Sequence, residues 1–213
     1  MNKKKLLALA IAGVLTVGAV GAGTLAFFTA SHEVKNVITM GDVDVDLEEP
    51  NFPGGKDGGE IPNITPGASF EKDPTITLKE NSEDAYARVQ LKVSATKDTA
   101  NFALTDAEVA ELFTGIDVDQ TDWFVAGPVK EVKDEVAVSY TYTLYYKDKL
   151  SNKEGGVTEV KAFENVTIPS NWGNKFKNVS IVLDVTAEVI QADNFTPVTA
   201  NGMITSWGNI TIE

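Results

Sequence analysis

The chain contains few residues that could perform metal-dependent hydrolysis. Among its 213 residues there is one histidine, His32, and no cysteine. A catalytic zinc takes three protein ligands and leaves one position open, and the helical His-Glu-x-x-His motif supplies two of those ligands. Glu33 follows His32, but Asn36 stands at the second histidine position, and the surrounding residues alternate as in a strand. We therefore predict no zinc peptidase site; the alternative, a site of carboxylates alone, suits zinc poorly.

Covalent and acid–base catalysis have no better candidates. A serine nucleophile needs a neighbouring base, and the single histidine lies close to the amino terminus, so no Ser/His/Asp set can be assigned. The chain has 31 acidic residues, but the sequence singles out no pair of them. We interpret these acids as a solvated surface and predict that the protein is not an enzyme and uses no catalytic cofactor.

Three regularly spaced carboxylates form a candidate calcium site. Asp42, Asp44 and Asp46 alternate with aliphatic residues. In a strand such acids project from one face about 7 Å apart, so they would share a calcium ion only with help from a neighbouring loop. The glycine and the terminal glutamate of an EF-hand loop are missing. The alternative is a row of solvent-facing charges that discourages pairing at a sheet edge.

Aromatic side chains suggest a second function class, carbohydrate binding. Trp123, Trp172 and Trp207, with the tyrosines between residues 140 and 146, would suit sugar rings if their faces were exposed. Such residues also fill the cores of β-sandwiches. A carbohydrate-binding module that contacts polysaccharide is therefore the alternative to a structural role.

The first 26 residues have the layout of an export signal. Lys3 to Lys5 precede a run from Leu6 to Ala26 that carries no charge, and Thr24-Leu25-Ala26 presents short residues to a signal peptidase. We expect cleavage between Ala26 and Phe27, which would place the protein outside the cell or at the cell surface. The alternative is an uncleaved anchor, because about 20 uncharged residues can span a bilayer.

The charge of the chain argues against nucleic-acid partners. The net charge is −13, and removal of residues 1–26 takes away three lysines and no acid, which leaves −16. Such a surface repels nucleic acid and anionic lipid. Because the chain has no cysteine, the exported domain must be held together by packing rather than by disulfides.

The residues after the leader alternate with the period of a strand. The even positions between 28 and 40 are mostly apolar and include Phe28, Ala30, Val34, Ile38 and Met40. We interpret residues 27–40 as one half-buried strand. It could complete the protein's own sheet or be lent to a neighbouring subunit, and the alternation fits both arrangements.

Residues 41–213 carry the signals of an antiparallel β domain. Proline and glycine concentrate in residues 50–68, which we expect to be a loop. Strands are expected at residues 42–47, 69–79, 86–93, 136–146, 157–168, 181–189 and 204–212. We further expect 69–79 and 86–93 to form a hairpin, and Gly127-Pro128 to form a turn.

One short helix is expected after Leu104. Thr105 can cap it, Glu108 completes a capping box three residues later, and Gly115 ends it. Many strands, a single helix and no regular alternation of strands with helices predict an all-β antiparallel sandwich of the jelly-roll or Greek-key type.

Several of these segments resemble a known family. They are the junction GTLAFFTA at residues 23–30, the alternation NVITMGDVDVDL at 36–47, the Pro66-Gly67 pair, and the strand that contains Tyr86 and Arg88. Together they resemble the TasA/camelysin family of exported proteins from Firmicutes. The detailed likeness covers residues 1 to about 93, and a looser one covers 185–191.

The resemblance implies a function that the residues alone do not. Members of this family have leaders that a SipW-type signal peptidase removes, adopt a jelly-roll fold, and assemble into biofilm fibres by passing an amino-terminal strand to a neighbour. It therefore implies self-association through residues 27–40, with other matrix proteins or polysaccharide as further partners. Camelysin-like members have also been classed as metallopeptidases, which is a third alternative. The carboxyl half departs from the better-known fibre protein, which leaves main and accessory subunits both open.

Overall fold

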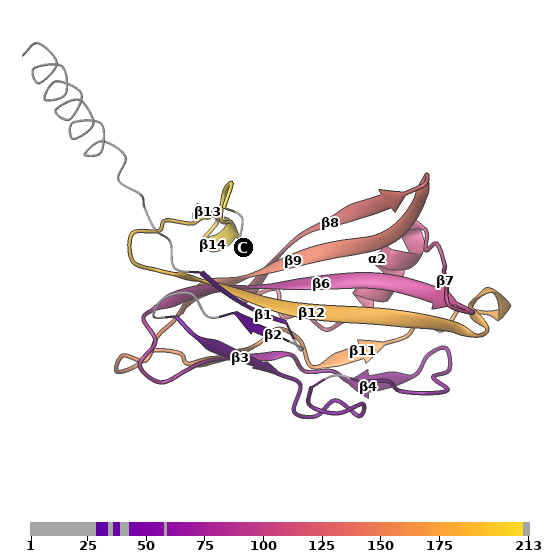
Figure 1. Cartoon of the computed structure of the whole chain (residues 1–213), viewed down its shortest axis with the longest axis horizontal. Coiled ribbons are helices and arrows are strands. Elements are labelled where there is room, and N and C mark those ends of the chain that lie inside the picture. The colour runs from indigo at the N-terminus through magenta and orange to yellow at the C-terminus, as the bar shows by residue number, and fades with distance from the viewer. Residues whose placement is uncertain (1–28, 34–35, 39–42, 58, 211–213) are drawn as a thin grey trace, which may run out of the picture.

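The structure is a computed structural model of the chain, and it describes residues 29–33, 36–38, 43–57 and 59–210, with side chains from residue 43 onward. Within these residues the chain forms antiparallel strands around a core, with one short α-helix (Figure 1). The prediction of an all-β antiparallel sandwich with one short helix is confirmed. No helix in the described ranges is long and apolar enough to cross a membrane, and the predicted leader, residues 1–26, lies outside them.

A large antiparallel sheet forms one layer of the sandwich. In spatial order it contains β2 (Asn36–Ile38), β1 (Thr29–Glu33), β12 (Val179–Gln191), β6 (Ala85–Lys97), β9 (Val136–Leu150) and β8 (Trp123–Lys133), and the short β7 (Ala100–Asn101) pairs with β6. The long strands β12, β6 and β9 lie in the middle, so β2 and β8 are the two edges of this sheet.

Short strands form the opposite layer of the sandwich, and a separate two-stranded hairpin lies on the outer face of the large sheet. A three-stranded sheet has the order β10 (Glu159–Lys161), β5 (Thr75–Leu78) and β3 (Val45–Glu48), and β4 (Ser69–Glu71) pairs with β11 (Asn165–Thr167). The hairpin of β13 (Val198–Ala200) and β14 (Met203–Ser206) is separate from both. Figure 1 shows β3, β4 and β11 on one side of the large sheet and β13–β14 on the other.

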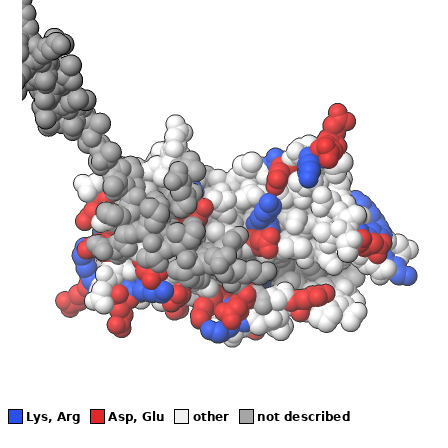
Figure 2. All heavy atoms as spheres, viewed as in Figure 1, with Lys and Arg blue, Asp and Glu red and all other residues white. Residues whose placement is uncertain are grey.

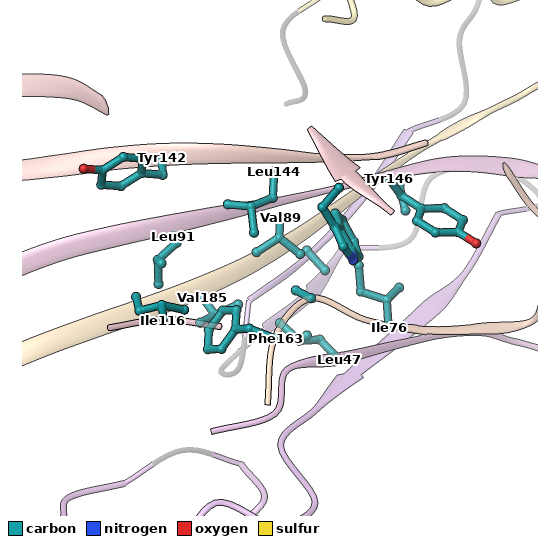
Figure 3. Close-up of a cluster of buried hydrophobic side chains, with 14 of the residues drawn as sticks. Leu47, Ile76, Val89, Leu91, Ile116, Tyr142, Leu144, Tyr146, Phe163 and Val185 are labelled. Carbon is teal, nitrogen blue, oxygen red and sulfur yellow. The ribbon is translucent and has the colours of Figure 1, made fainter. Parts of the chain in front are cut away.

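The core lies between the two layers because the central strands alternate regularly. In β6, every second residue from Ala85 to Ala95 is buried, and the residues between them are half-buried or exposed. Figure 3 shows Leu91 of β6 pointing towards Ile116, and Leu144 of β9 on the side of the cluster opposite Leu47 of β3. Each fully buried aliphatic side chain contributes about 1.5–3 kcal/mol, so packing stabilises a domain that has no cysteine and therefore no disulfide.

The helix α2 (Asp106–Thr114) begins and ends at the predicted residues. The Glu108 N–H donates to Thr105 Oγ1 at 3.2 Å, and the Thr105 N–H donates to the Glu108 carboxylate at 2.9 Å, so the capping box is confirmed. The Gly115 N–H donates to the Leu112 carbonyl and ends the helix. Val109 and Leu112 are fully buried, which packs α2 against the core.

Three predicted strands are each divided in the structure. Residues 28–40, expected as one strand, contain β1 and β2, which pair antiparallel with each other. Residues 69–79 contain β4 and β5, and residues 157–168 contain β10 and β11; in both cases the two pieces belong to different sheets. An unbroken alternation does not reveal a bend between sheets. Pro74 does mark one, because proline cannot donate to a strand ladder.

Two predicted reversals of the chain are wrong. Residues 69–79 and 86–93 do not form a hairpin, because β6 pairs with β12 and β9, whereas β4 and β5 lie in the opposite layer. Gly127-Pro128 is not a turn, because β8 continues through it with a shift of register against β9. Gly127 has a φ of +108°, and the extra residues form a bulge in an otherwise continuous strand.

A second apolar cluster covers part of the outer face of the large sheet. Trp207 and Phe195, from the segment that contains β13 and β14, pack against Tyr145 of β9 and Ile190 of β12. The Arg88 guanidinium lies 4.4 Å from the centroid of the Trp207 ring. The carboxyl-terminal segment therefore covers the end of β12 that pairs with β1.

Candidate functional site

The predicted donor segment lies beside β12, a long central strand of the large sheet. β1 pairs antiparallel with β12 in a register that places Ala30 opposite Val189 and His32 opposite Ala187. Val189 and Ala187 are fully buried in the core. β1 therefore lies on a strand that belongs to the core, not on a peripheral one.

The predicted donor residues are only partly within the described structure. Ala30 lies in β1 and Ile38 in β2, whereas Phe28, Val34, Met40 and the predicted cleavage site between Ala26 and Phe27 lie outside the described residues. The segment adds two short strands to the sheet instead of one. Its donation to another subunit stays a prediction.

A buried carboxylate on β12 faces away from the core at this position. Glu188 is 9% exposed, forms an ion pair with Arg88, and accepts hydrogen bonds from Gln90 Nε2 at 3.0 Å. In the register, Ser31 of β1 stands opposite Glu188. Because the carboxylate is already paired, a strand at this position does not meet an uncompensated buried charge.

A lysine already forms ion pairs with two of the three predicted calcium ligands. Asp44 and Asp46 project from the exposed side of the β3 segment, as predicted, and Asp42 lies outside the described residues. Lys79 Nζ lies 3.0 Å from Asp44 and 3.1 Å from Asp46. Hydrogen bonds to Asp44 and Asp46 raise the pKa of Lys79, so the ammonium takes the place that a shared cation would need. Calcium binding stays a prediction.

The donor set does not fit a catalytic zinc. His32 lies on a strand, and Asn36 is opposite Glu33 in the pairing of β1 with β2. Within the described parts of the chain there is no group of three or more His, Cys, Asp or Glu placed to hold a metal ion. Three protein ligands are the usual requirement for catalytic zinc.

The tryptophans do not form an exposed platform for sugar rings. Trp123, Trp172 and Trp207 are 1%, 4% and 2% exposed. All the tyrosines of β9 between residues 140 and 146 are buried as well. Trp123 Nε1 donates to the Lys161 carbonyl at 2.8 Å. The expectation of a carbohydrate platform is therefore wrong for these residues: Trp123 and Trp172 lie in the sandwich core, as the alternative predicted, and Trp207 lies in the second apolar cluster on the outer face.

A surface pocket of about 570 Å³ lies between the start of β8 and β10. It is lined by Trp123 and by carboxylates that already have partners. Asp117 accepts hydrogen bonds from the N–H groups of Glu164 and Asn165 at 2.8 and 2.7 Å, and Asp122 pairs with Lys147. These groups stabilise their own loops, so the pocket offers no free set of catalytic side chains.

Two buried ionic groups were missed by sequence reasoning. Glu49, which is 1% exposed, pairs with Lys72 at 2.6 Å. Asp84 accepts hydrogen bonds from Lys149 Nζ and Ser151 Oγ, both at 2.6 Å, and from Lys153 Nζ at 3.0 Å. The partners of Asp84 lie at least 65 residues away in the chain, and no local pattern marks such pairs.

Comparison with protein families matches residues 1–120 to the family described as camelysin metallo-endopeptidase. No curated protein and no solved structure matches the chain. The matched residues include the predicted leader, β1 to β7 and α2, and they cover more than half of the 213 residues. The chain therefore belongs to the camelysin family.

Proposed function

We propose that the protein is a secreted structural subunit of an extracellular biofilm matrix, which polymerises into fibres by lending residues 27–40 to the next subunit. The observation that carries this proposal is the place of β1: the segment that follows the leader lies on β12, a strand of the core. The leader pattern and membership of the camelysin family support export. The poor fit of the donor set to zinc favours a structural role over a catalytic one.

The edge of β12 gives a physical reason for strand donation. Without β1, backbone N–H and C=O groups would be unpaired beside the buried Ala187 and Val189. Such an edge recruits a strand from another chain. Each large apolar side chain that the donor buries would contribute about 1.5–3 kcal/mol, less the entropy lost when a loose terminus becomes ordered. The balance favours association through this segment.

Processing of the leader would control when the strand becomes available. While residues 1–26 are attached, one end of the segment is held at the membrane. Cleavage between Ala26 and Phe27 by a SipW-type signal peptidase would release it, and assembly would then begin outside the cell.

Engineered cysteines test whether β1 pairs within one chain or between chains. Residues directly opposite in an antiparallel pair have Cα atoms about 4.5–5.5 Å apart, within the range of about 4.4–6.8 Å that a disulfide spans. We expect an oxidised mixture of Ala30→Cys and Val189→Cys chains, each lacking residues 1–26, to form covalent heterodimers. The double variant should form a ladder of covalent multimers on a non-reducing gel.

The control pairs Ala30→Cys with Val157→Cys, an exposed position that lies outside β12. This mixture should give no heterodimer above the background of random collisions. Strand donation would be refuted if the double variant closed only into cross-linked monomers and the mixture of single variants stayed unlinked. Since the chain has no native cysteine, every disulfide observed would come from the engineered positions.

We further infer that the protein has no peptidase activity of its own, although its family is described as a metallo-endopeptidase. The reason is the single histidine, which lies on a strand. The purified chain should not cleave unfolded casein faster than a buffer blank, with or without zinc, and His32→Ala should behave identically. A chelator-sensitive activity that His32→Ala abolished would contradict this inference.

A further inference from the structure

The hairpin of β8 and β9 carries an unusual share of exposed apolar surface. Six large apolar side chains are exposed among the described residues, and three of them, Val129, Val132 and Val136, lie on this hairpin. Val129 is 71% exposed and Val132 is 55% exposed. We refer to residues 129–136 as the hairpin arm. Figure 1 shows the arm at the end of the large sheet away from β13 and β14.

The arm includes the outermost strand of the large sheet. β8 pairs with β9 on one side and is the last strand in the sheet order on the other. Its outer backbone groups are therefore open to pairing with another strand. Charged residues on such an edge usually discourage this pairing, so their arrangement decides which partner fits.

The charges of the arm match a second copy of the same strand. Side chains of a strand alternate between two faces, and directly opposed residues of an antiparallel pair point to the same face. When two identical strands pair symmetrically in this way, the residue at the centre of the contact therefore stands opposite its own copy. Centring on Lys130, Glu131 or Lys133 would place identical charges opposite each other, and centring on Val129 would bring the bulge at Gly127-Pro128, whose proline has no N–H, into the ladder. Centring on Val132 instead places Glu131 opposite Lys133 of the second copy and the two Val132 side chains opposite each other. Because β8 ends at Lys133, this overlap consists of residues 131–133 of each copy.

The lysine of this contact is available, and the glutamate would share its present partners. Lys133 forms no hydrogen bond or ion pair with another described residue, whereas Glu131 pairs with Lys92 at 3.1 Å and accepts a hydrogen bond from Ser139 Oγ at 2.7 Å, both through Oε2. Figure 2 shows acidic and basic side chains close together at this end of the molecule. With two lysines and three acids the arm is close to neutral, whereas the whole chain has a net charge of −13, which would oppose self-association elsewhere on its surface.

We propose that two copies of this chain pair through β8, antiparallel and centred on Val132, so that their large sheets join into one. The pairing goes beyond strand donation and does not depend on it, because it uses the opposite edge of the sheet. Donation extends an assembly from one subunit to the next, whereas pairing through β8 links two subunits side by side. Together the two contacts would connect neighbouring fibres.

A cysteine at the centre of the contact tests the register. In the proposed pair, position 132 stands opposite itself, and opposed Cα atoms about 4.5–5.5 Å apart suit a disulfide. The chain without residues 1–26, carrying Val132→Cys, should form covalent dimers during mild oxidation. Val129→Cys is the matched control, since this position is on the same strand and more exposed but lies outside the overlap, because β8 ends at Lys133 and Asp134 and Glu135 form the turn. Its cross-linking should be at least tenfold slower.

Charge substitutions test the same contact from its flanks. In the Val132→Cys chain, Lys133→Glu places glutamates opposite each other and should slow cross-linking at least tenfold, and adding Glu131→Lys should restore the rate. Equal rates at positions 129 and 132, or failure of the charge exchange to restore the rate, would overturn the proposed register. Absence of dimers for Val132→Cys would overturn the pairing itself. None of these variants alters Ala30 or Val189, so the outcome is independent of the test for strand donation.

Discussion

Single residues join parts of this chain that are far apart in sequence, and Asp84 shows how. Its carboxylate is 5% exposed and ties the start of β6 to the end of β9 through Lys149, Ser151 and Lys153. The hydrogen bond from Lys149, followed by that from Ser151, holds the pKa of Asp84 below its ordinary value of 3.8. The ionised carboxylate is therefore the form that the folded state stabilises.

This lowered pKa predicts a loss of stability in acid. The contribution of Asp84 is present above the pKa of 3.8 that it has when unfolded, and it is lost as the pH falls from there toward the lower pKa of the folded state. Asp84→Asn should lower the free energy of unfolding by about 1–3 kcal/mol at pH 7, and by less at pH 3. Urea denaturation at both pH values measures this. An equal loss at both would show that the charge of Asp84 contributes nothing.

At the residue scale, local signals were predictable and distant partners were not. The capping box of Thr105 and Glu108 spans three residues, so its sequence pattern contains the whole interaction. The pair of Glu49 and Lys72 spans 23 residues, and both residues look like ordinary surface charges until the fold brings them together. The interaction of Lys79 with Asp44 and Asp46 was missed for the same reason.

At the scale of elements, long alternating strands were predictable because the pattern follows from the geometry of a two-layer core. β6, β9 and β12 each match a predicted strand and extend beyond it. The short strands were predicted less well: alternation continues through the bends that separate β4 from β5 and β10 from β11. Similarly, the glycine and proline in β8 resemble a turn signal, although they form a bulge there.

The bulge in β8 makes a specific prediction about Gly127. It has a φ of +108°, and a Cβ added there would lie 2.9 Å from the Thr141 carbonyl oxygen on the neighbouring strand. Gly127→Ala should therefore destabilise the protein by about 1–3 kcal/mol, measured by urea denaturation. Gly155→Ala is the control, because its φ is +77° but nothing lies within 4 Å of the added Cβ. If both variants lost the same stability, the contact with Thr141 would be irrelevant.

At the scale of the whole molecule, the two halves of the chain are interleaved within one sheet. The family match ends at residue 120, yet β6 from the matched part lies between β12 and β9 from the remainder. The matched and unmatched parts therefore share one sheet, although the likeness to the family covers only the amino-terminal part. The arrangement of strands could not be predicted from the sequence, because alternation identifies a strand but not its neighbours.

This interleaving predicts that the matched part cannot fold alone. A chain of residues 27–120 would retain β6 without either of its long neighbours, leaving Val89 and Leu91 exposed to water. We expect it to show no cooperative thermal transition by circular dichroism, whereas residues 27–213 should show one. A sharp transition in the shorter chain would mean that residues 27–120 are an independent domain.

The pairing of β1 with β12 also has a consequence in time. Ala30 and Val189 stand 159 positions apart, so the first strand to emerge from the ribosome waits for almost the last before its own sheet can receive it. At synthesis rates of about 5–20 residues per second, that delay is on the order of ten seconds. The amino-terminal segment is therefore the part of the large sheet whose partner strand is missing until the chain is almost complete.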